Sequence, residues 1–155
     1  MVIMYTDGAS RGNPGRGGYG TVLIYNQHRK EMCAGYRLTT NNRMELMAVI
    51  IGLEALKKPG TDVTVYTDSQ YVVDAVQKGW IWTWIRKNFK DRKNEDLWRR
   101  FIEVYNKHNV SFQWIKGHSG IPENERCDEL AVTCADGANL LVDEGYEQEH
   151  RIEKD

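Results

Sequence analysis

Two short runs of strand-forming residues, 2–5 and 63–67, are each followed closely by an aspartate, Asp7 and Asp68. The first is continuously apolar, which is typical of a strand covered on both faces, and a turn at residues 6–8 is expected to end it. A mobile turn is predicted from the glycines between residues 12 and 20. Residues 21–25 and 31–38 are β-prone and predict two more strands, which complete an antiparallel meander with the first.

Residues 42–58 carry apolar positions around much of a helical circumference and end at Pro59 and Gly60, which predicts a helix packed on the sheet. Because this helix connects two strands, the strand at 63–67 should run parallel to the first. Further helices are predicted at 69–77, within 79–89, at 94–107 and at 122–135, and a last strand at 110–114. The order indicates an α/β fold with a mixed five-stranded sheet, three antiparallel strands then two parallel ones, and helices packed on both faces.

The chain has 155 residues, which suits one domain. We expect residues 1–142 to form a single catalytic domain and residues 143–155 to form an acidic, flexible C-terminal tail. The formal net charge of -1 hides an asymmetry. Residues 78–100 contain eight basic and three acidic side chains, whereas residues 143–155 contain six acidic and two basic ones. The total charge does not indicate a nucleic-acid partner, but the basic face formed by residues 78–100 is compatible with one.

The three cysteines, Cys33, Cys127 and Cys134, form no C-x-x-C pair and no zinc-finger spacing with histidine. We expect neither disulfides nor a zinc site, and interpret them as small apolar residues in a reducing cytosol. No segment approaches the roughly 18 apolar residues of a membrane span, and the first residues lack the features of a secretory signal. The expected location is cytoplasmic, with no membrane contact.

Four acidic residues lie in short motifs: Asp7 in YTDG, Glu45 in NNRMEL, Asp68 in YTDSQY and Asp128 in ERCDEL. Asp7 and Asp68 follow parallel strands, and ligands of open α/β sheets gather at such carboxyl ends. Neighbouring carboxylates repel one another unless divalent cations neutralise them, and oxygen ligands suit Mg²⁺ or Mn²⁺. Each residue alone could be a turn, cap or solvated position, but together they indicate a metal site.

These motifs, with GNPG at 12–15, GGYG at 17–20, DLW at 96–98, WIKGH at 114–118 and the segment 122–131, resemble bacterial type 1 ribonuclease H from about residue 2 to 146. The resemblance implies a ribonuclease H-like fold and an endonuclease that hydrolyses the RNA strand of RNA/DNA hybrids, leaving 5′-phosphate and 3′-hydroxyl ends. It implies that the four carboxylates hold two Mg²⁺ ions, for which Mn²⁺ can substitute. It also implies that His118 moves protons or clears product, with Asn124 and Glu125 beside it.

The same resemblance assigns residues to the hybrid. Those matched to hybrid contacts are Asn13, Asn41, Asn42 and Gln70, whose amides suit the 2′-hydroxyl of RNA. Those matched to a pocket for a DNA-strand phosphate are Thr40 and Asn94, and those matched to a basic substrate-binding protrusion are Trp80, Trp84, Arg86 and Lys87. The protrusion is shorter between residues 89 and 94 than in the best-known bacterial forms, which predicts weaker affinity for long hybrids. At least one of Trp80, Trp82 and Trp84 is expected to be buried.

Two other functions remain open. A module on the same fold could bind hybrids without cutting them, and a related metal-dependent nuclease could act on DNA. The presence of all four carboxylates argues against the first, and the NNRME and KGH motifs argue against the second. No obligate protein partner is expected, and a monomer is the simplest assembly.

Overall fold

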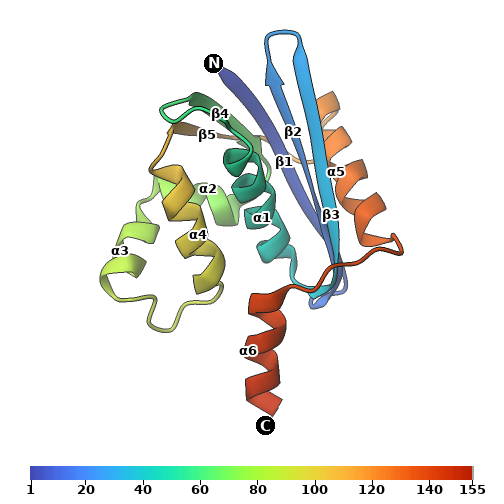
Figure 1. The fold of residues 1–155 in the computed structure, drawn as a ribbon, viewed down its shortest axis with the longest axis vertical. Helices are drawn as coiled ribbons and strands as arrows, with labels where there is room; N and C mark the ends of the chain where they lie inside the picture. Colours follow the sequence, from blue (N-terminus) through green and yellow to red (C-terminus); the bar gives the residue numbers. More distant parts are fainter. Residues whose placement is uncertain (155) are drawn as a thin grey trace.

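The computed structural model describes residues 1–154, the last four by their backbone alone. Strands and helices follow one another in the order that the sequence predicts, with one additional helix at the end (Figure 1). The strands are β1 Val2–Arg11, β2 Gly15–Tyr25, β3 His28–Thr39, β4 Asp62–Thr67 and β5 Asn109–Trp114. The helices are α1 Asn41–Glu54, α2 Gln70–Gln77, α3 Trp80–Arg86, α4 Glu95–Tyr105, α5 Pro122–Ala135 and α6 Glu144–Lys154.

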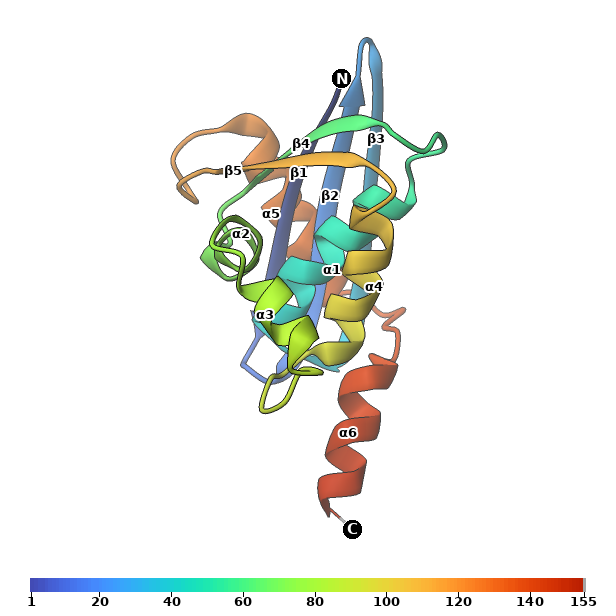
Figure 2. The same ribbon diagram turned by 90° about the vertical axis from the view of Figure 1, so that its left-hand side faces the viewer.

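The five strands form one sheet in the order β3-β2-β1-β4-β5. β1 and β3 run antiparallel to β2, while β4 runs parallel to both β1 and β5. Helix α5 covers one face over β1 to β3, and α1 packs on the other face, with α2, α3 and α4 on the same side (Figures 1 and 2). The expected α/β fold, with a mixed sheet and helices on both faces, is confirmed.

Strand β1 is longer than expected and contains Asp7 within it. It pairs with β2 as far as Arg11 opposite Arg16, so the turn expected at residues 6–8 is wrong. Its parallel pairing with β4 ends at Thr6 opposite Thr67. Asp7 therefore lies where β1 and β4 separate, although the strand itself continues. One face of these two strands is only half covered, and there the rings of Tyr5 and Tyr66 stack 4.9 Å apart.

The glycine-rich segment is mostly strand, so the mobile turn expected at residues 12–20 is wrong. Only residues 12–14 form the turn, and β2 begins at Gly15. A Cβ atom on Gly18 would clash with the carbonyl oxygen of Ala131, and one on Gly20 with that of Cys127. These glycines thus let the backbone of α5 approach β2 closely.

The expectation of no disulfide is also wrong. Cys33 of β3 and Cys134 of α5 are joined by a disulfide, with their Cα atoms 6.4 Å apart, and Cys127 is a buried free cysteine. The two partners are 101 residues apart in the sequence, and only the packing of α5 on β3 brings them together.

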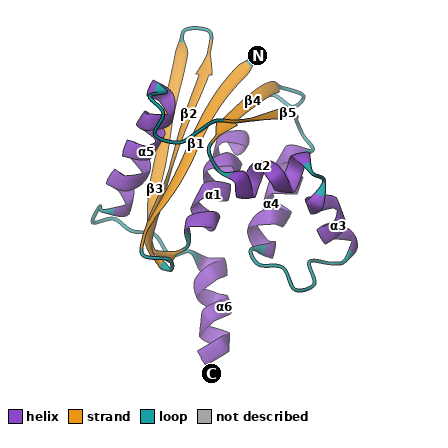
Figure 3. Cartoon of the chain, turned by 180° about the vertical axis from the view of Figure 1, so that it is seen from behind, coloured by secondary structure: helices purple, strands orange, loops and turns teal. Residues whose placement is uncertain are grey.

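The acidic C-terminal segment, for which the sequence predicts a flexible tail from residue 143, begins with a buried residue and a helix. Asp143 is buried, and α6 follows it directly (Figure 3). Asp143 caps this helix, because its Oδ1 accepts a hydrogen bond from the backbone N–H of Tyr146 at 3.4 Å. None of the described helices is long and apolar enough to cross a membrane.

Candidate active site

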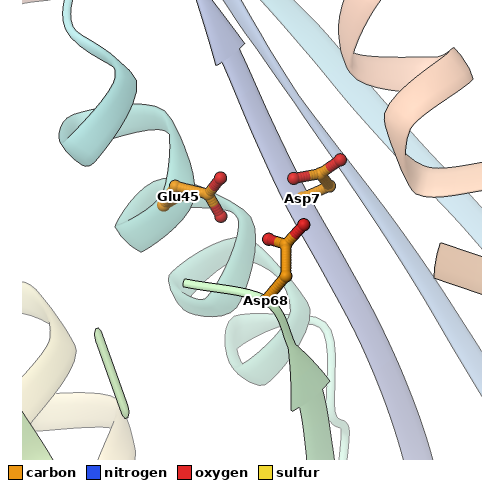
Figure 4. A group of neighbouring side chains, drawn as sticks. All are labelled: Asp7, Glu45 and Asp68. Carbon is orange, nitrogen blue, oxygen red and sulfur yellow. The ribbon is translucent and has the colours of Figure 1, made fainter. Parts of the chain in front are cut away.

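Three carboxylates from separate elements meet where β1 and β4 separate. Asp7 belongs to β1, Asp68 follows β4 directly, and Glu45 lies one turn into α1. Each offers one oxygen, and these oxygens all lie within 4.8 Å of one another. Figure 4 shows the three side chains directed toward one another. Gly8 permits this arrangement, because a Cβ atom there would clash with the backbone nitrogen of Glu45.

Burial and mutual repulsion make these groups hard to ionise together. Burial, followed by the charge of Asp68, raises the pKa of Asp7 to about 8. Burial and the charges of Asp7 and Asp68 raise the pKa of Glu45 well above its ordinary value. The pKa of Asp68 is also raised, chiefly by burial, while His118 opposes that rise. A positive charge placed among the three would remove this penalty.

The donor set fits a hard divalent cation. Asp7 and Glu45 are each 6% exposed, and within the described part of the chain no hydrogen bond reaches Oε2 of Glu45. Oδ1 of Asp7 accepts one hydrogen bond, from the backbone N–H of Gly8 at 2.9 Å. A buried carboxylate oxygen left without a donor is costly, whereas a cation such as Mg²⁺ or Mn²⁺ uses such oxygens as ligands.

Asp128 lies close to this cluster but outside it. It is half-buried on α5, across the sheet from α1, and it does not belong to the group of oxygens within 4.8 Å. Its charge nevertheless contributes to the raised pKa values of Asp7 and Asp68. The structure thus brings together three of the four expected carboxylates and places the fourth in electrostatic range.

His118 is exposed on a loop that passes over Asp68. A Cβ atom on the preceding Gly117 would clash with Oδ2 of Asp68, so the loop approaches that carboxylate closely. His118 has φ 54°, a left-handed conformation that is uncommon outside glycine, and the Ser119 hydroxyl donates to the carbonyl of Lys116 at 2.6 Å. The loop leads into α5, whose first turn carries the buried Asn124 and the exposed Glu125.

Four of the expected hybrid-binding residues lie at helix starts or in the adjoining turn. Oδ1 of Asn13 accepts a hydrogen bond from the backbone N–H of Asn41 at 3.1 Å, so two of them are in direct contact. Asn42 is exposed on the first turn of α1, and Gln70 is exposed at the start of α2, two residues after Asp68.

Thr40 and Asn94 line one cavity of about 430 Å³, together with Asn13 and Asn42. Thr40 caps α1, and its Oγ1 accepts a hydrogen bond from the backbone N–H of Arg43 at 3.3 Å. Asn94 precedes α4 in a left-handed conformation and donates from Nδ2 to the Tyr71 hydroxyl at 3.0 Å. Two residues that are 54 positions apart in the sequence thus share one pocket.

The tryptophans of α3 are less buried than expected. Trp80 and Trp82 are exposed, and Trp84 is half-buried with its ring edge-on to Trp98 at 5.6 Å. Ile81 and Trp98 occupy the core positions instead, so the expectation that at least one of the three tryptophans is buried is wrong, and Trp84 is only half-buried. Arg86 and Lys87 are exposed, and the guanidinium of Arg92 lies over the Trp84 ring at 5.2 Å from its centroid.

The sequence interpretation missed a buried charge network beside the cavity. Arg43 of α1 is 1% exposed and forms ion pairs with Asp96 at 2.7 Å and with Asp143 at 2.8 Å. Thr39 also donates to Asp143, at 2.6 Å. Although burial alone would raise it, the pKa of Asp96 is lowered by the Arg43 guanidinium. An arginine within the apolar run of α1 was the available signal, because a buried guanidinium requires acidic partners.

Comparison with known proteins identifies the family. A family model described as RNase H matches residues 1–136. This chain belongs to the RNase H family. Ribonuclease H of Desulforamulus reducens is 56% identical to it over 147 residues, which is 92% of each chain. Ribonuclease HI of a Synechocystis species is 50% identical over 151 residues, 94% of each chain.

Solved RNase H structures have the same fold. The crystal structure of LC9-RNase H1, described as a type 1 RNase H with the type 2 active-site motif, superposes with a TM-score of 0.81 at 33% identity. The match covers 96% of this chain and 79% of that one. The crystal structure of LC11-RNase H1 in complex with an RNA/DNA hybrid superposes with a TM-score of 0.65 at 26% identity. That match covers 85% of this chain and 94% of the other. The chain is thus an endoribonuclease of the RNase H family, as the resemblance implied.

Proposed function

We propose that this RNase H hydrolyses the RNA strand of RNA/DNA hybrids by using Asp7, Glu45, Asp68 and Asp128 as ligands of two Mg²⁺ ions, for which Mn²⁺ can substitute. The observation that carries the proposal is the meeting of three carboxylate oxygens within 4.8 Å beside an unpaired buried oxygen of Glu45. When bound, the ions supply a water of lowered pKa and neutralise charge on the departing 3′ oxygen.

The protein's own residues would divide the remaining work. Asp7 and Glu45 are buried and are carried by a strand and a helix, so they would hold the ions at a defined position. Asp128 completes the ligand set from α5. His118, on an exposed loop above Asp68, would move protons or help to clear product. Asn124 and Glu125 support that loop from the start of α5.

Hybrid recognition would use the surface that continues from the carboxylates. Asn13, Asn41, Asn42 and Gln70 present amides to the 2′-hydroxyl groups of the RNA strand. Thr40 and Asn94 would hold a phosphate of the DNA strand in their shared cavity. On α3, Trp80, Trp84, Arg86 and Lys87 extend the surface along the DNA strand by stacking and charge. The complex of LC11-RNase H1 with a hybrid supports this class of substrate.

The decisive test compares labelled RNA/DNA hybrid, duplex DNA, duplex RNA and single strands in Mg²⁺, with Asp7→Asn as the matched inactive control. We expect cleavage of the hybrid alone, leaving 5′-phosphate and 3′-hydroxyl ends, and no cleavage in chelator. Binding without cleavage would support a hybrid-binding module instead. Cutting of DNA would support a related DNA-directed nuclease.

We also propose that the protein acts as a cytoplasmic monomer without an obligate partner. Light scattering during size-exclusion chromatography should give the mass of one 17.9 kDa chain. A concentration-independent dimer mass would contradict this assignment.

A further inference from the structure

The C-terminal helix α6 borders the cavity proposed for the DNA-strand phosphate. Thr40, Lys93 and Asn94 line that cavity from the body of the protein, and Glu149 and His150 of α6 line it as well. Figures 1 and 3 show α6 leaving the molecule beside the beginning of α1, where Thr40 lies. A pocket suited to an anion therefore includes a carboxylate from a segment that the sequence separates from the catalytic motifs.

The first turns of α6 are held firmly enough to place Glu149. Tyr146 is buried, and the ring of His150 packs against it at a tilt of 32°, with centroids 3.9 Å apart. Glu147 forms an ion pair with Arg37 of β3 at 2.9 Å, which ties the helix to the sheet edge. Glu149 follows the buried Tyr146 by three residues, so the two lie on one side of α6, and both border the cavity.

The charges around Glu149 leave it poorly compensated once a phosphate enters. It also borders an adjoining cavity of about 380 Å³ with Arg92 and Asp96. Asp96 is already paired with Arg43. Thr40 and Asn94 contribute neutral groups, so among the lining residues whose side chains the structure describes, Lys93 supplies the permanent positive charge, beside the imidazole of His150. A phosphate would share that one lysine with the Glu149 carboxylate.

We propose that Glu149 is a specificity-determining residue that weakens binding of the DNA strand in this pocket, so that α6 sets the affinity for the hybrid. The inference rests on the proposed function, because it takes the occupant to be a backbone phosphate of the substrate. Two like charges about 7 Å apart repel enough to change an equilibrium about threefold when water screens them fully, and up to about fiftyfold at the lower dielectric constant of a protein surface. Neutralising Glu149 should therefore tighten hybrid binding without changing the chemistry at the carboxylates.

The test measures kcat and KM for a hybrid with Glu149→Gln and Glu149→Lys in the full chain. We expect KM to fall about threefold for the glutamine variant and further for the lysine variant, with kcat within about twofold of the unsubstituted protein. The matched control is Glu144→Gln, which removes the same charge from an exposed position of α6 that does not line the cavity. Its KM should stay unchanged.

Two further measurements separate local repulsion from a structural effect. The advantage of Glu149→Gln should shrink at about 0.5 M salt, where the Debye length is roughly 4 Å. It should also disappear for a hybrid whose DNA strand carries uncharged methylphosphonate linkages. Equal melting temperatures would show that the glutamine variant folds normally, and that variant decides the test if the lysine variant does not fold.

An unchanged or raised KM for Glu149→Gln, or an equal drop for Glu144→Gln, would overturn the inference. A persistent advantage with the methylphosphonate strand would overturn it as well, because the repelled charge would then lie elsewhere. These results differ from failure of the proposed function, in which the unsubstituted protein itself would not cut the hybrid.

Discussion

Burial and mutual repulsion act on the same three side chains, Asp7, Glu45 and Asp68. They affect the stability of the fold as well as the chemistry of the site. All three have raised pKa values, with burial as the largest cause in each case. The three carboxylates bind cations only when they are ionised, but in this buried position ionisation is unfavourable unless a cation is present. The site should therefore cost folding stability whenever divalent ions are removed.

The first prediction concerns removal of one charge. Asp7→Asn or Asp68→Asn should abolish hybrid cleavage, yet raise the free energy of unfolding in chelator by about 1 kcal/mol at pH 9, because one source of repulsion is lost. Thermal melts check the stability, and Glu103→Gln on the exposed face of α4 is the matched control. Marked destabilisation of both aspartate variants would mean that these carboxylates are structural.

The second prediction is a pH dependence. Asp7 has a pKa of about 8 in the folded protein, against 3.8 for an ordinary aspartate, so the stability that its proton contributes is complete below about pH 4 and is lost as the pH rises through about 8. In chelator the melting temperature should fall as the pH rises from about 4 to about 8, and it should fall less for Asp7→Asn. Added Mg²⁺ should reverse the trend, because ligand binding to the ionised form stabilises the folded state. A chelator profile identical in the two proteins would contradict the assignment.

Among the elements, α3 and the segment after it carry most of the exposed positive charge near the proposed substrate surface. Lys87, Lys90 and Arg92 surround Trp84 in a cavity of about 520 Å³. The half-buried Trp84 anchors this region to the core through Trp98, while the cations remain exposed. We therefore propose that this element binds the charged backbone of the substrate without taking part in the reaction.

The third prediction tests this role. Replacing Lys87, Lys90, Arg92 and Lys93 together with glutamine should raise KM and flatten its dependence on salt, because fewer phosphate counterions are released on binding. Steady-state kinetics between 50 and 300 mM salt provide the measurement. Replacing Lys30, Lys57, Lys58 and Lys107, which are exposed elsewhere, is the charge-matched control. An altered kcat with an unchanged KM would contradict the proposal that the basic region binds the substrate.

Across the whole molecule, one buried arginine joins three segments that are far apart in the sequence. Arg43 lies in α1, two residues before Glu45, while Asp96 opens α4 and Asp143 precedes α6. Gly145 allows the last segment to approach, since a Cβ atom there would clash with Oδ2 of Asp96. The C-terminal segment is consequently joined to the helix that carries a proposed metal ligand.

The fourth prediction follows from that network. Asp143→Asn should lower the free energy of unfolding by about 3 kcal/mol, because it leaves part of a buried guanidinium uncompensated. Chemical denaturation provides the measurement, and Glu144→Gln, at the neighbouring exposed position, should change it by less than about 0.5 kcal/mol. Equal effects of the two substitutions would show that the network does not stabilise the fold.

Local pattern was enough to predict most of the architecture. The apolar runs before Asp7 and Asp68, the helix predicted at 42–58 and Pro122 at the start of α5 each depend on neighbours within a few positions. The structure has each of these elements, although α1 already ends at Glu54. The glycines of β2 were interpreted wrongly because a glycine that permits close packing and one that permits a turn look the same in a sequence.

The sequence by itself determined the order of the elements, the family motifs and the residue types of the site, because periodicity and short motifs are properties of adjacent positions. Only the tertiary structure decided that Asp128 lies outside the carboxylate cluster, that Arg43 pairs with Asp143, that Cys33 joins Cys134, and that Glu149 borders the pocket of Thr40 and Asn94. Such contacts depend on how the sheet twists and on how closely helices pack against it, and no local pattern encodes those distances.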